Sequence, residues 1–353
     1  MTRPEPVPLR LDHLVDVLSI WTGIRPEHLR PGGLGPAFFE RLRCDLNEDI
    51  LGQRHAIESA AAALRRCHSL PEPAGAPRPL WTAIFGGPSG VGKSALARSL
   101  AVRFWETESA LIQIDCSELD QEHTLARLVG APPGYVGYKQ GGQLCNDLRR
   151  LAGGVILFDE IEKGHPALLR ALLLPLLGEG TVHDMSSGER LDASRFAVIL
   201  TSNLGAQYAG ASPGFLVSDD RAADRRRRAT AAAIAGWLPR EIAGRVDDTI
   251  VFNQLDAASL RGIWERDLRQ LQARIRQSGV DLHLVVEPAV TDFLLAVHEA
   301  DFQAQGARAL RRVFERDVTD RCLEMLTAMT APSAELHIDI GGGAELCYEL
   351  RPV

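Results

Sequence analysis

The stretch Gly87-Pro88-Ser89-Gly90-Val91-Gly92-Lys93-Ser94 decides the fold of this chain of 353 residues. It matches the pattern GxxxxGK[ST], follows a short apolar run at 81–85, and opens a segment whose apolar residues recur at helical spacing. A strand, a glycine-rich loop and a helix in this order form a phosphate-binding loop, or P-loop, because backbone N–H groups and the helix dipole converge on phosphate oxygens. An incidental glycine-rich turn would not need these flanking elements. The sequence therefore predicts a nucleoside triphosphate site, with Lys93 on the β and γ phosphates and Ser94 on Mg²⁺.

A second motif with the same chemistry is Val155-Ile156-Leu157-Phe158-Asp159-Glu160. An apolar strand that ends in two acids places both carboxylates at the carboxyl edge of a parallel sheet, beside the P-loop. We expect Asp159 to hold Mg²⁺ through its water shell and Glu160 to orient and deprotonate the attacking water. A solvated acidic turn is the alternative, which the nearby P-loop makes weaker. The second acid favours hydrolysis over phosphoryl transfer to a small molecule.

A third apolar run, at 196–200, ends in Thr201-Ser202-Asn203. A polar side chain at this strand tip would lie between the nucleotide and the attacking water. Asn203 is therefore predicted to sense the γ-phosphate, although Ser and Asn clusters also mark ordinary loops.

The order of apolar runs and helical patterns predicts an α/β fold with two domains. Short apolar runs alternate with helical patterns up to residue 252, which indicates a parallel sheet covered on both faces. Beyond residue 252 the pattern is mostly helical, with three strand-like segments. We expect strands at 80–85, 110–114, 154–158, 196–201, 281–287, 335–340 and 345–350, and C-terminal helices at 256–278, 288–299 and 307–328. The predicted division is an N-terminal helical and linker segment at 1–36, a large ATPase domain at 37–252 and a small lid domain at 253–353.

Composition excludes several classes of protein. The formal net charge of −7 argues against a general binder of nucleic acids or anionic membranes. No apolar run approaches the length of a membrane span, and the first residues lack the apolar core of a signal peptide. The six cysteines show neither CxxC nor Cys/His metal spacing, which indicates reduced thiols. We therefore expect a cytoplasmic protein without a nucleic-acid or membrane partner.

The most specific motif is the stretch GAPPGYVGYKQGGQL at 130–144. With the P-loop and the acidic motif, it resembles the second, C-terminal ATPase module of the Clp family of AAA+ ATPases, the group of ClpB, ClpA, ClpC and ClpV. In that family this stretch is the pore loop that grips substrate, which implies that Tyr135 is the aromatic paddle and that Val136 supports it. The glycines around Tyr135 would let its ring project, and an aromatic face can hold any peptide without reading its sequence. A surface loop with a packed tyrosine is the alternative.

The resemblance also implies further site residues. Leu51 and Gly52 belong to a box, Ile50-Leu51-Gly52-Gln53, that lies on the adenine side in the family. Gly306-Ala307-Arg308 matches the small-domain motif whose arginine reaches the γ-phosphate. Residues 239–252 resemble the arginine-finger segment, with Arg245 at the finger position. A finger that serves the neighbouring subunit implies a ring, and the family assembles hexamers, so a homo-hexamer is expected.

Several positions depart from the family pattern. Gly244 replaces the asparagine before the finger arginine, and residues 240–242 differ after the family's proline. Pro175 should kink or end a helical run at 172–177. The second pore-loop region, at 178–191, matches loosely. The sequence shows neither an upstream ATPase module nor the coiled-coil middle domain of the disaggregases, so full disaggregase activity is not among our expectations.

The sequence thus predicts an ATPase that threads or remodels polypeptides in a ring, with ATP and Mg²⁺ as cofactors. Two alternatives stay open: a AAA+ motor acting on nucleic acid, and a low-turnover, nucleotide-gated scaffold or adaptor. A peptidase ring or a secretion machine also stays open as a partner, but the segment at 212–216 carries Pro213 where protease-coupled members carry an aliphatic residue. Asp219, Asp220 and Asp224 are interleaved with the arginines at 221 and 225–228, which indicates a solvated helix face.

Overall fold

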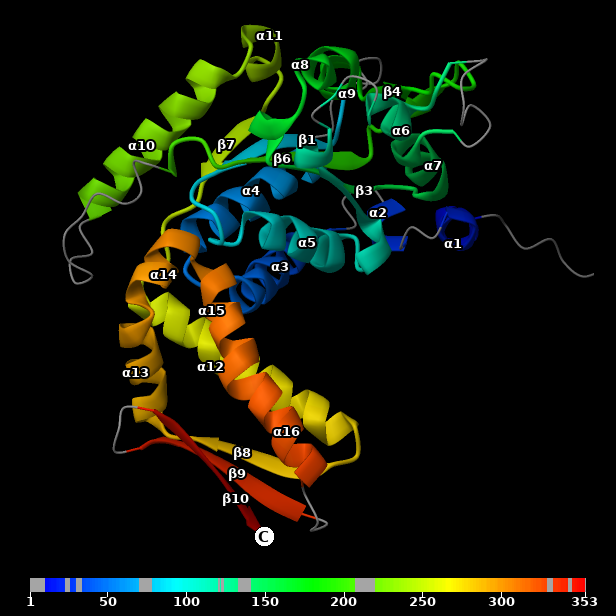
Figure 1. The fold of residues 1–353 in the computed structure, drawn as a ribbon. Coiled ribbons are helices and arrows are strands. Elements are labelled where there is room, and N and C mark those ends of the chain that lie inside the picture. The colour runs from blue at the N-terminus through cyan, green and yellow to red at the C-terminus, as the bar shows by residue number, and fades with distance from the viewer. Residues whose placement is uncertain are drawn as a thin grey trace, which may run out of the picture.

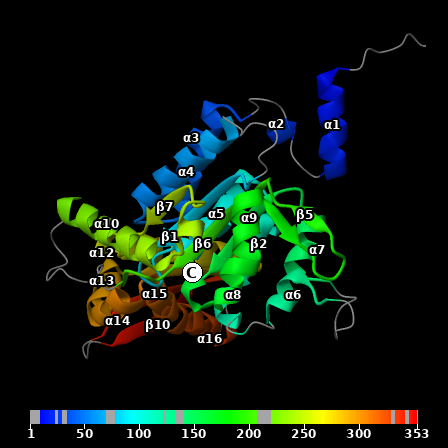
Figure 2. The same ribbon diagram turned by 90° about the horizontal axis from the view of Figure 1, so that it is seen from above.

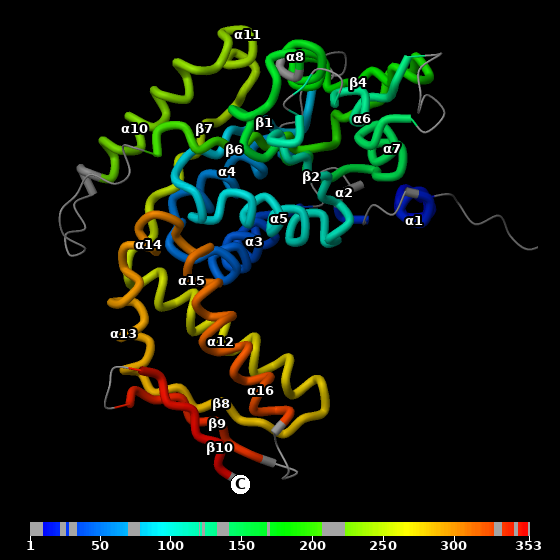
Figure 3. Tube along the Cα trace, in the orientation of Figure 1, coloured from blue at the N-terminus to red at the C-terminus, as the bar shows by residue number. Residues whose placement is uncertain are grey.

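The computed structural model describes residues 10–22, 26–29, 34–69, 78–119, 121, 124–132, 141–206, 220–328, 333–341 and 345–352. Within these residues the chain forms a large α/β part followed by a smaller one (Figure 1). The trace of the chain places the last strands at the end of the molecule opposite α11 (Figure 3).

A five-stranded parallel sheet forms the centre of the large part. Its strands lie in the order β2-β3-β6-β1-β7. Because all five run the same way, their carboxyl ends meet at one edge, where the loop after β1 begins. The bounds are β1 Trp81–Gly86, β2 Leu111–Asp115, β3 Gly154–Asp159, β6 Phe196–Ser202 and β7 Asp248–Val251. This sheet contains the four strands predicted in this part of the sequence, and β7 is an unpredicted fifth strand.

Helices cover both faces of this sheet because its strands alternate between two apolar cores. Ile156 and Phe158 of β3 point into one core, whereas Val155 and Leu157 point into the other. The helices whose buried residues share the core of Val155 are α3 Pro36–Asp49, α4 Arg54–Ser69 and α5 Lys93–Phe104. Those of the opposite core are α6 Leu125–Val129, α7 Gln143–Arg150, α9 Leu174–Glu179, α10 Asp220–Trp237 and α11 Arg240–Ala243. A parallel sheet buried on both sides was predicted, and it is confirmed.

Pro175 is the second residue of α9, and it has no N–H to donate to a carbonyl of the preceding helical turn. A π-helix at Leu169–Leu173 comes directly before it. The regular α-helical pattern is therefore interrupted just ahead of the proline, as expected. The remaining short elements here are α8 Pro166–Leu168, the 3₁₀ helices Glu108–Ala110, Cys116–Glu118 and Ile161–Lys163, and a hairpin of β4 Thr181–His183 and β5 Arg190–Asp192.

The smaller part has its own apolar core. Trp264 of α12 is 1% exposed and meets Phe314 edge to face, with 5.0 Å between the ring centroids. Its sheet has the order β10-β9-β8, with β8 parallel and β10 antiparallel to β9. Its helices are α12 Ala257–Gln277, α13 Pro288–Val297, α14 Glu299–Gln305, α15 Ala307–Phe314 and α16 Asp320–Ala328, with a π-helix at Glu315–Thr319; its strands are β8 Asp281–Val286, β9 Ser333–Ile340 and β10 Leu346–Pro352. The predicted α/β class with a smaller C-terminal part is confirmed.

Two helices of the described chain precede α3. They are α1 Leu11–Thr22 and α2 Pro26–Leu29, and both lie in the segment at 1–36 that was predicted as helical and linker. Seen from above, α1 lies to one side of the rest of the described chain (Figure 2). None of the helices in the described part of the chain has both the length and the apolar composition needed to cross a bilayer.

Candidate nucleotide site

The loop between β1 and α5 has the shape that the sequence predicts. Its glycines at 87, 90 and 92 all have positive φ angles, of 141°, 73° and 106°. At Gly90 a side chain is also excluded by space, since a Cβ there would lie 2.0 Å from the carbonyl oxygen of Gln305. The backbone can therefore turn around a phosphate while it lies directly against the smaller part of the chain.

Lys93, the first residue of α5, lies inside this loop. It is 7% exposed, and its Nζ donates hydrogen bonds to the carbonyl oxygens of Gly87 and Pro88 at 2.7 and 2.6 Å. Nζ also donates to Oδ1 of Asn203 at 2.9 Å. Burial lowers the pKa of Lys93 to about 8, against the opposing effect of nearby carboxylates. The ammonium group is thus held at the mouth of the loop by neutral acceptors that a phosphate could replace.

The predicted Mg²⁺ ligands Ser94 and Asp159 lie together. Oγ of Ser94 is 2.9 Å from both carboxylate oxygens of Asp159. Thr201, at the end of β6, donates from its hydroxyl to Asp159 and accepts the N–H of Glu160 at 2.9 Å. A hydroxyl and a carboxylate at this distance are the oxygen donors that Mg²⁺ takes from a protein when phosphates and water complete its shell.

Glu160 is held from both sides. It adopts φ 54° and ψ 55°. Among the described non-glycine residues, only Glu160 and Glu106 have a positive φ. Nδ2 of Asn203 donates to its Oε1 at 3.0 Å, and Lys163 forms an ion pair with its Oε2. The hydrogen bond from Lys163 keeps the pKa of Glu160 below its ordinary value, although burial acts the other way. The side chain is therefore ionised at neutral pH, as a general base requires.

Asn203 connects Lys93 to Glu160. Its amide accepts from Lys93 and donates to Glu160, while its backbone N–H donates to Oε1 of Glu162 at 2.8 Å. The other oxygen of Glu162 is buried without a hydrogen-bond partner. The predicted residues Lys93, Ser94, Asp159, Glu160 and Asn203 are thus brought together at one edge of the sheet.

The smaller part closes this edge into a cleft of about 620 Å³. Nη1 of Arg308, in α15, donates to Oγ of Ser89 at 2.9 Å, and the N–H of Ala307 donates to the carbonyl of Gly90 at 2.9 Å. Arg308 therefore reaches the P-loop from the second part of the chain. The smaller part also lines the cleft with residues of α12, α15 and the following π-helix: Ile263, Arg266, Asp267, Gln270, Leu271, Arg274, Arg311, Phe314 and Glu315.

Leu51 and Gly52 lie where the two parts meet. Leu51 packs against the core of the smaller part, and a Cβ at Gly52 would lie 2.4 Å from Oγ of Ser259. The next residue, Gln53, is 1% exposed and bonds both Val91 and Asn253, at 3.2 and 2.8 Å. Residues 51–53 therefore join the P-loop to the segment that leads into α12.

Arg245 does not join this cluster. Its Nη1 donates to the carbonyl of Leu174 in α9, and its own carbonyl accepts from Thr82 at 2.8 Å. Thr82 is near the start of β1, whereas the P-loop begins after the strand's end, roughly 16 Å away at 3.3 Å per residue. Arg245 is an exposed side chain at the opposite edge of the sheet from the P-loop of its own chain.

The predicted pore-loop residues Tyr135 and Val136 lie outside the described residues. Gly130 before them and Gln143 after them are described. We call the sheet edge that carries Lys93, Ser94, Asp159, Glu160 and Asn203 the nucleotide edge. Three further residues bond to this edge but were not predicted as site residues: Thr201, Glu162 and Gln53. Each stands in or beside a motif that the sequence analysis used, but its contacts depend on how distant elements pack, which no local pattern signals.

The affinity for nucleotide is expected to fall as pH rises above about 8. Below this pH the ammonium of Lys93 is charged before nucleotide binds, whereas above it a proton must be taken up on binding. Affinity should then fall by up to about tenfold per pH unit. Titration with fluorescent ADP at pH 7, 8 and 9 measures this, and calorimetry in two buffers of different ionisation enthalpy counts the protons. A constant affinity without proton uptake would contradict the prediction.

Known families match both parts of this chain. Residues 78–249 match the family model described as AAA domain (Cdc48 subfamily), and residues 255–338 match the one described as the C-terminal, D2-small domain of ClpB protein.

Curated relatives give the same result. Over 307 residues the chain is 39% identical to Chaperone protein ClpB 1 of Synechococcus elongatus, which covers 86% of this chain and 33% of that protein. Over 334 residues it is 35% identical to Chaperone protein ClpB of Bacillus cereus, covering 93% and 37%. The chain therefore spans about a third of the length of these relatives.

A solved structure also matches, a closed-state cryo-electron microscopy reconstruction of Hsp104 with ATPγS and FITC casein. The likeness has a TM-score of 0.79 at 27% identity, and it covers 97% of this chain and 56% of that chain. The two family models follow each other along the sequence in the order in which the structure builds its two parts. The chain belongs to the Clp family of AAA+ ATPases, and it corresponds to a ClpB-like C-terminal ATPase module.

Proposed function

We propose that this chain binds ATP with Mg²⁺, hydrolyses it in the cleft between its two parts, and uses the energy to unfold or remodel polypeptides. The observation that carries the proposal is the convergence of Lys93, Ser94, Asp159, Glu160 and Asn203 at one sheet edge. These side chains supply a fixed positive charge, two oxygen donors for a metal ion, a carboxylate base and an amide that touches that base. This is the set that ATP hydrolysis needs.

Binding follows from the position of each group. Lys93 would exchange its carbonyl partners for phosphate oxygens, and the P-loop N–H groups would surround the phosphates. Ser94 and Asp159 would hold Mg²⁺, which when bound neutralises charge that develops on the phosphates. Arg308 would reach the γ-phosphate from α15, and Leu51 with Gly52 would line the adenine side.

Hydrolysis would use Glu160 as the base. Its carboxylate would accept a proton from water, and Asn203, already bonded to it at 3.0 Å, would orient the reacting groups. Since Asn203 also contacts Lys93 in this structure, phosphate binding to Lys93 would free the amide oxygen of Asn203. The γ-phosphate would in this way be sensed at the base itself.

Work on polypeptide would require a ring. The similar Hsp104 structure is a reconstruction with FITC casein, which supports a polypeptide as substrate. We propose a homo-hexamer in which Arg245 serves the neighbouring subunit and Tyr135 and Val136 grip the substrate. For each subunit we propose the predicted domains, with boundaries at residues 36 and 252. The separate apolar core of the smaller part, which begins at Leu255, supports the second of these boundaries. All six cysteines are free thiols, which supports the cytoplasm as compartment.

The test is which polymer stimulates ATP turnover. An unfolded protein such as casein should raise the turnover of the wild-type chain, and single- or double-stranded DNA should not. Stimulation by DNA alone would favour the nucleic-acid motor. Tight ATP binding with turnover unaffected by Glu160→Gln would favour the scaffold.

Replacing Tyr135 with Ala is expected to separate turnover from work. The nucleotide edge is intact in this variant, so it should hydrolyse ATP, but without an aromatic face it should not pull apart a folded, tagged fluorescent protein. Tyr135→Phe keeps the ring and should retain unfolding. Loss of fluorescence at the wild-type rate with Tyr135→Ala would exclude the pore-loop assignment.

A further inference from the structure

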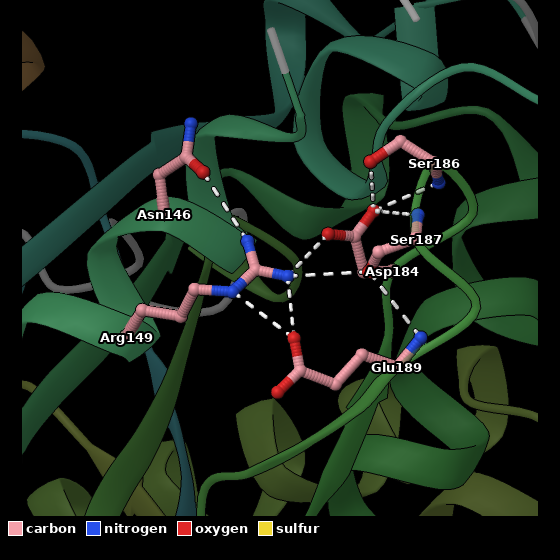
Figure 4. Close-up of polar contacts among 6 residues, drawn as sticks. All are labelled: Asn146, Arg149, Asp184, Ser186, Ser187 and Glu189. Atoms are coloured by element: carbon pink, nitrogen blue, oxygen red, sulfur yellow. Dashed lines mark hydrogen bonds and ion pairs between the residues drawn. The ribbon is translucent and has the colours of Figure 1, made fainter. Parts of the chain in front are cut away.

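The turn of the β4–β5 hairpin contains a buried carboxylate that the proposed chemistry does not use. Asp184 directly follows β4, and its side chain is 1% exposed. Oδ1 accepts from the N–H and hydroxyl of Ser186 at 2.8 and 2.6 Å, and Oδ2 accepts from Nη2 of Arg149 at 2.5 Å (Figure 4). Burial alone would raise the pKa of Asp184, but these hydrogen bonds hold it well below its usual range.

Arg149 connects this turn to helix α7. Its guanidinium also binds Glu189, on the far side of the turn, with Nη2 2.8 Å and Nε 3.2 Å from the same carboxylate oxygen (Figure 4). Nη1 donates to Asn146 on its own helix at 3.3 Å. One arginine therefore fixes both ends of the turn to α7. A buried charge held in this way is costly to disrupt from one side.

The same turn also contacts the end of α6. The N–H of Met185 donates to the carbonyl of Val129 at 2.7 Å. Gly130 has φ 86°, and a Cβ there would lie 2.8 Å from Oδ1 of Asp184. A Cβ at Gly142, just before α7, would lie 2.1 Å from the carbonyl oxygen of Leu128. Tyr135 is preceded in the chain by residues 128–130 and followed by residues 142–149. The turn around Asp184 contacts both of these stretches.

These elements lead into the two strands that end at the nucleotide edge. α7 is followed by β3, whose tip carries Asp159 and Glu160. The hairpin is followed by β6, beyond whose end lies Asn203. β3 and β6 are neighbours in the sheet, paired from Gly154 to Phe158. The contact between Arg149 and Asp184 thus joins the entrances of two strands whose ends hold the proposed base and its partner.

We propose that Asp184 and Arg149 are positioning residues that make both ends of the Tyr135 segment move with strands β3 and β6. The pair transmits the state of the nucleotide edge to the substrate-gripping segment, without contact with ATP or substrate. This inference rests on the proposed function. A turn that merely folds the hairpin would need the bonds to Ser186, but not a guanidinium that spans from α7 to Glu189.

The variants remove the pair with little change in shape. Arg149→Met deletes the charge and keeps most of the side-chain length. Asp184→Asn keeps an oxygen for Ser186 while it removes the charge that faces Arg149. The matched control is Arg150→Met, because Arg150 is the adjacent residue of α7, is 61% exposed and pairs with Asp147 of its own helix.

The direct measurement is amide hydrogen exchange at residues 128–132 and 141–146, with and without ATP, in the Glu160→Gln background that is expected to keep ATP bound. ATP should change exchange at these amides in the parent chain and in Arg150→Met. In Arg149→Met and Asp184→Asn the change should shrink roughly 2- to 30-fold, the range for mutations that modulate coupling between sites. No response in the parent chain, or an equal response in all variants, would overturn the inference.

A second measurement uses chains with an intact Glu160 and compares ATP turnover with unfolding of a tagged fluorescent protein. Arg149→Met should keep basal turnover within about twofold, because Arg149 does not line the cleft, and should lose unfolding roughly 2- to 30-fold. A proportional loss of both activities would show a structural role and overturn the inference. If hydrogen exchange responds as expected while the wild-type chain does not unfold the tagged protein, the proposed unfolding function is wrong and the inferred coupling through Arg149 and Asp184 is supported.

Discussion

Replacing Glu160 with Gln is expected to stop ATP hydrolysis while ATP stays bound. The amide keeps the size of the side chain and still offers an oxygen to Nδ2 of Asn203, which is 3.0 Å from Oε1 in the wild-type chain. It cannot accept a proton from the attacking water. Turnover should fall about 100- to 10,000-fold, the usual contribution of general base catalysis.

The measurement is a comparison of steady-state phosphate release with the affinity for fluorescent ATP. Affinity should change little, because Lys93, Ser94 and Asp159 are untouched. Glu118→Gln is a matched control, since Glu118 is a 66% exposed carboxylate in the short helix that follows β2. Wild-type turnover in Glu160→Gln would remove Glu160 from the reaction, and a loss of ATP binding would assign it to the binding site.

Much of the fold could be predicted because its signals are local. The apolar runs that became β1, β2, β3 and β6 are long and bounded by turn residues, and the P-loop has a fixed spacing. β7 escaped because it is four residues long and buries only Ile250 and Val251.

The nucleotide edge was predictable in part for the same reason. Asp159 and Glu160 directly follow one apolar run and Asn203 lies three residues beyond another, so the parallel sheet alone brings them together. Gln53 could not be found in this way, because its partner Asn253 lies 200 residues along the chain. The pair of Arg149 and Asp184 likewise depends on how a hairpin packs against α7. The local sequence therefore predicts which residues lie at the strand ends, whereas the packing of distant elements decides which contacts connect those residues.

Replacing Arg245 with Ala is expected to collapse turnover while the affinity for ATP changes little. In this structure Arg245 lies at the edge of the sheet opposite its own P-loop, where its guanidinium contacts the carbonyl of Leu174. If it reaches a neighbour's γ-phosphate, its loss should reduce turnover about 10³- to 10⁵-fold, as with arginine fingers in other P-loop enzymes. Arg240→Ala is the matched control, because Arg240 lies in the same exposed segment. A turnover within the range of this control would exclude the finger role.

Loss of turnover alone does not distinguish a finger role of Arg245 from a structural role in holding α9. Rings that mix two variants distinguish these roles. In a ring each site meets the next subunit, so an Arg245→Ala subunit keeps an intact Lys93 and a Lys93→Ala subunit keeps an intact Arg245. In an equal random mixture about a quarter of the seams join a working P-loop to a working finger. Turnover should recover to as much as this fraction of wild type if Arg245 acts in trans.

The control mixture is Lys93→Ala with Glu160→Gln. Both changes disable the site of the subunit that carries them, so no seam is complete and turnover should stay at background in every ratio. Native mass spectrometry of differently tagged subunits must show that the rings are mixed in both experiments. Under that condition, recovery in the first mixture and none in the second assigns Arg245 to the neighbouring site. Absence of recovery in both mixtures would assign Arg245 a structural role within its own chain, through its contact with Leu174. A subunit that is misfolded by the change would not be rescued by its neighbour.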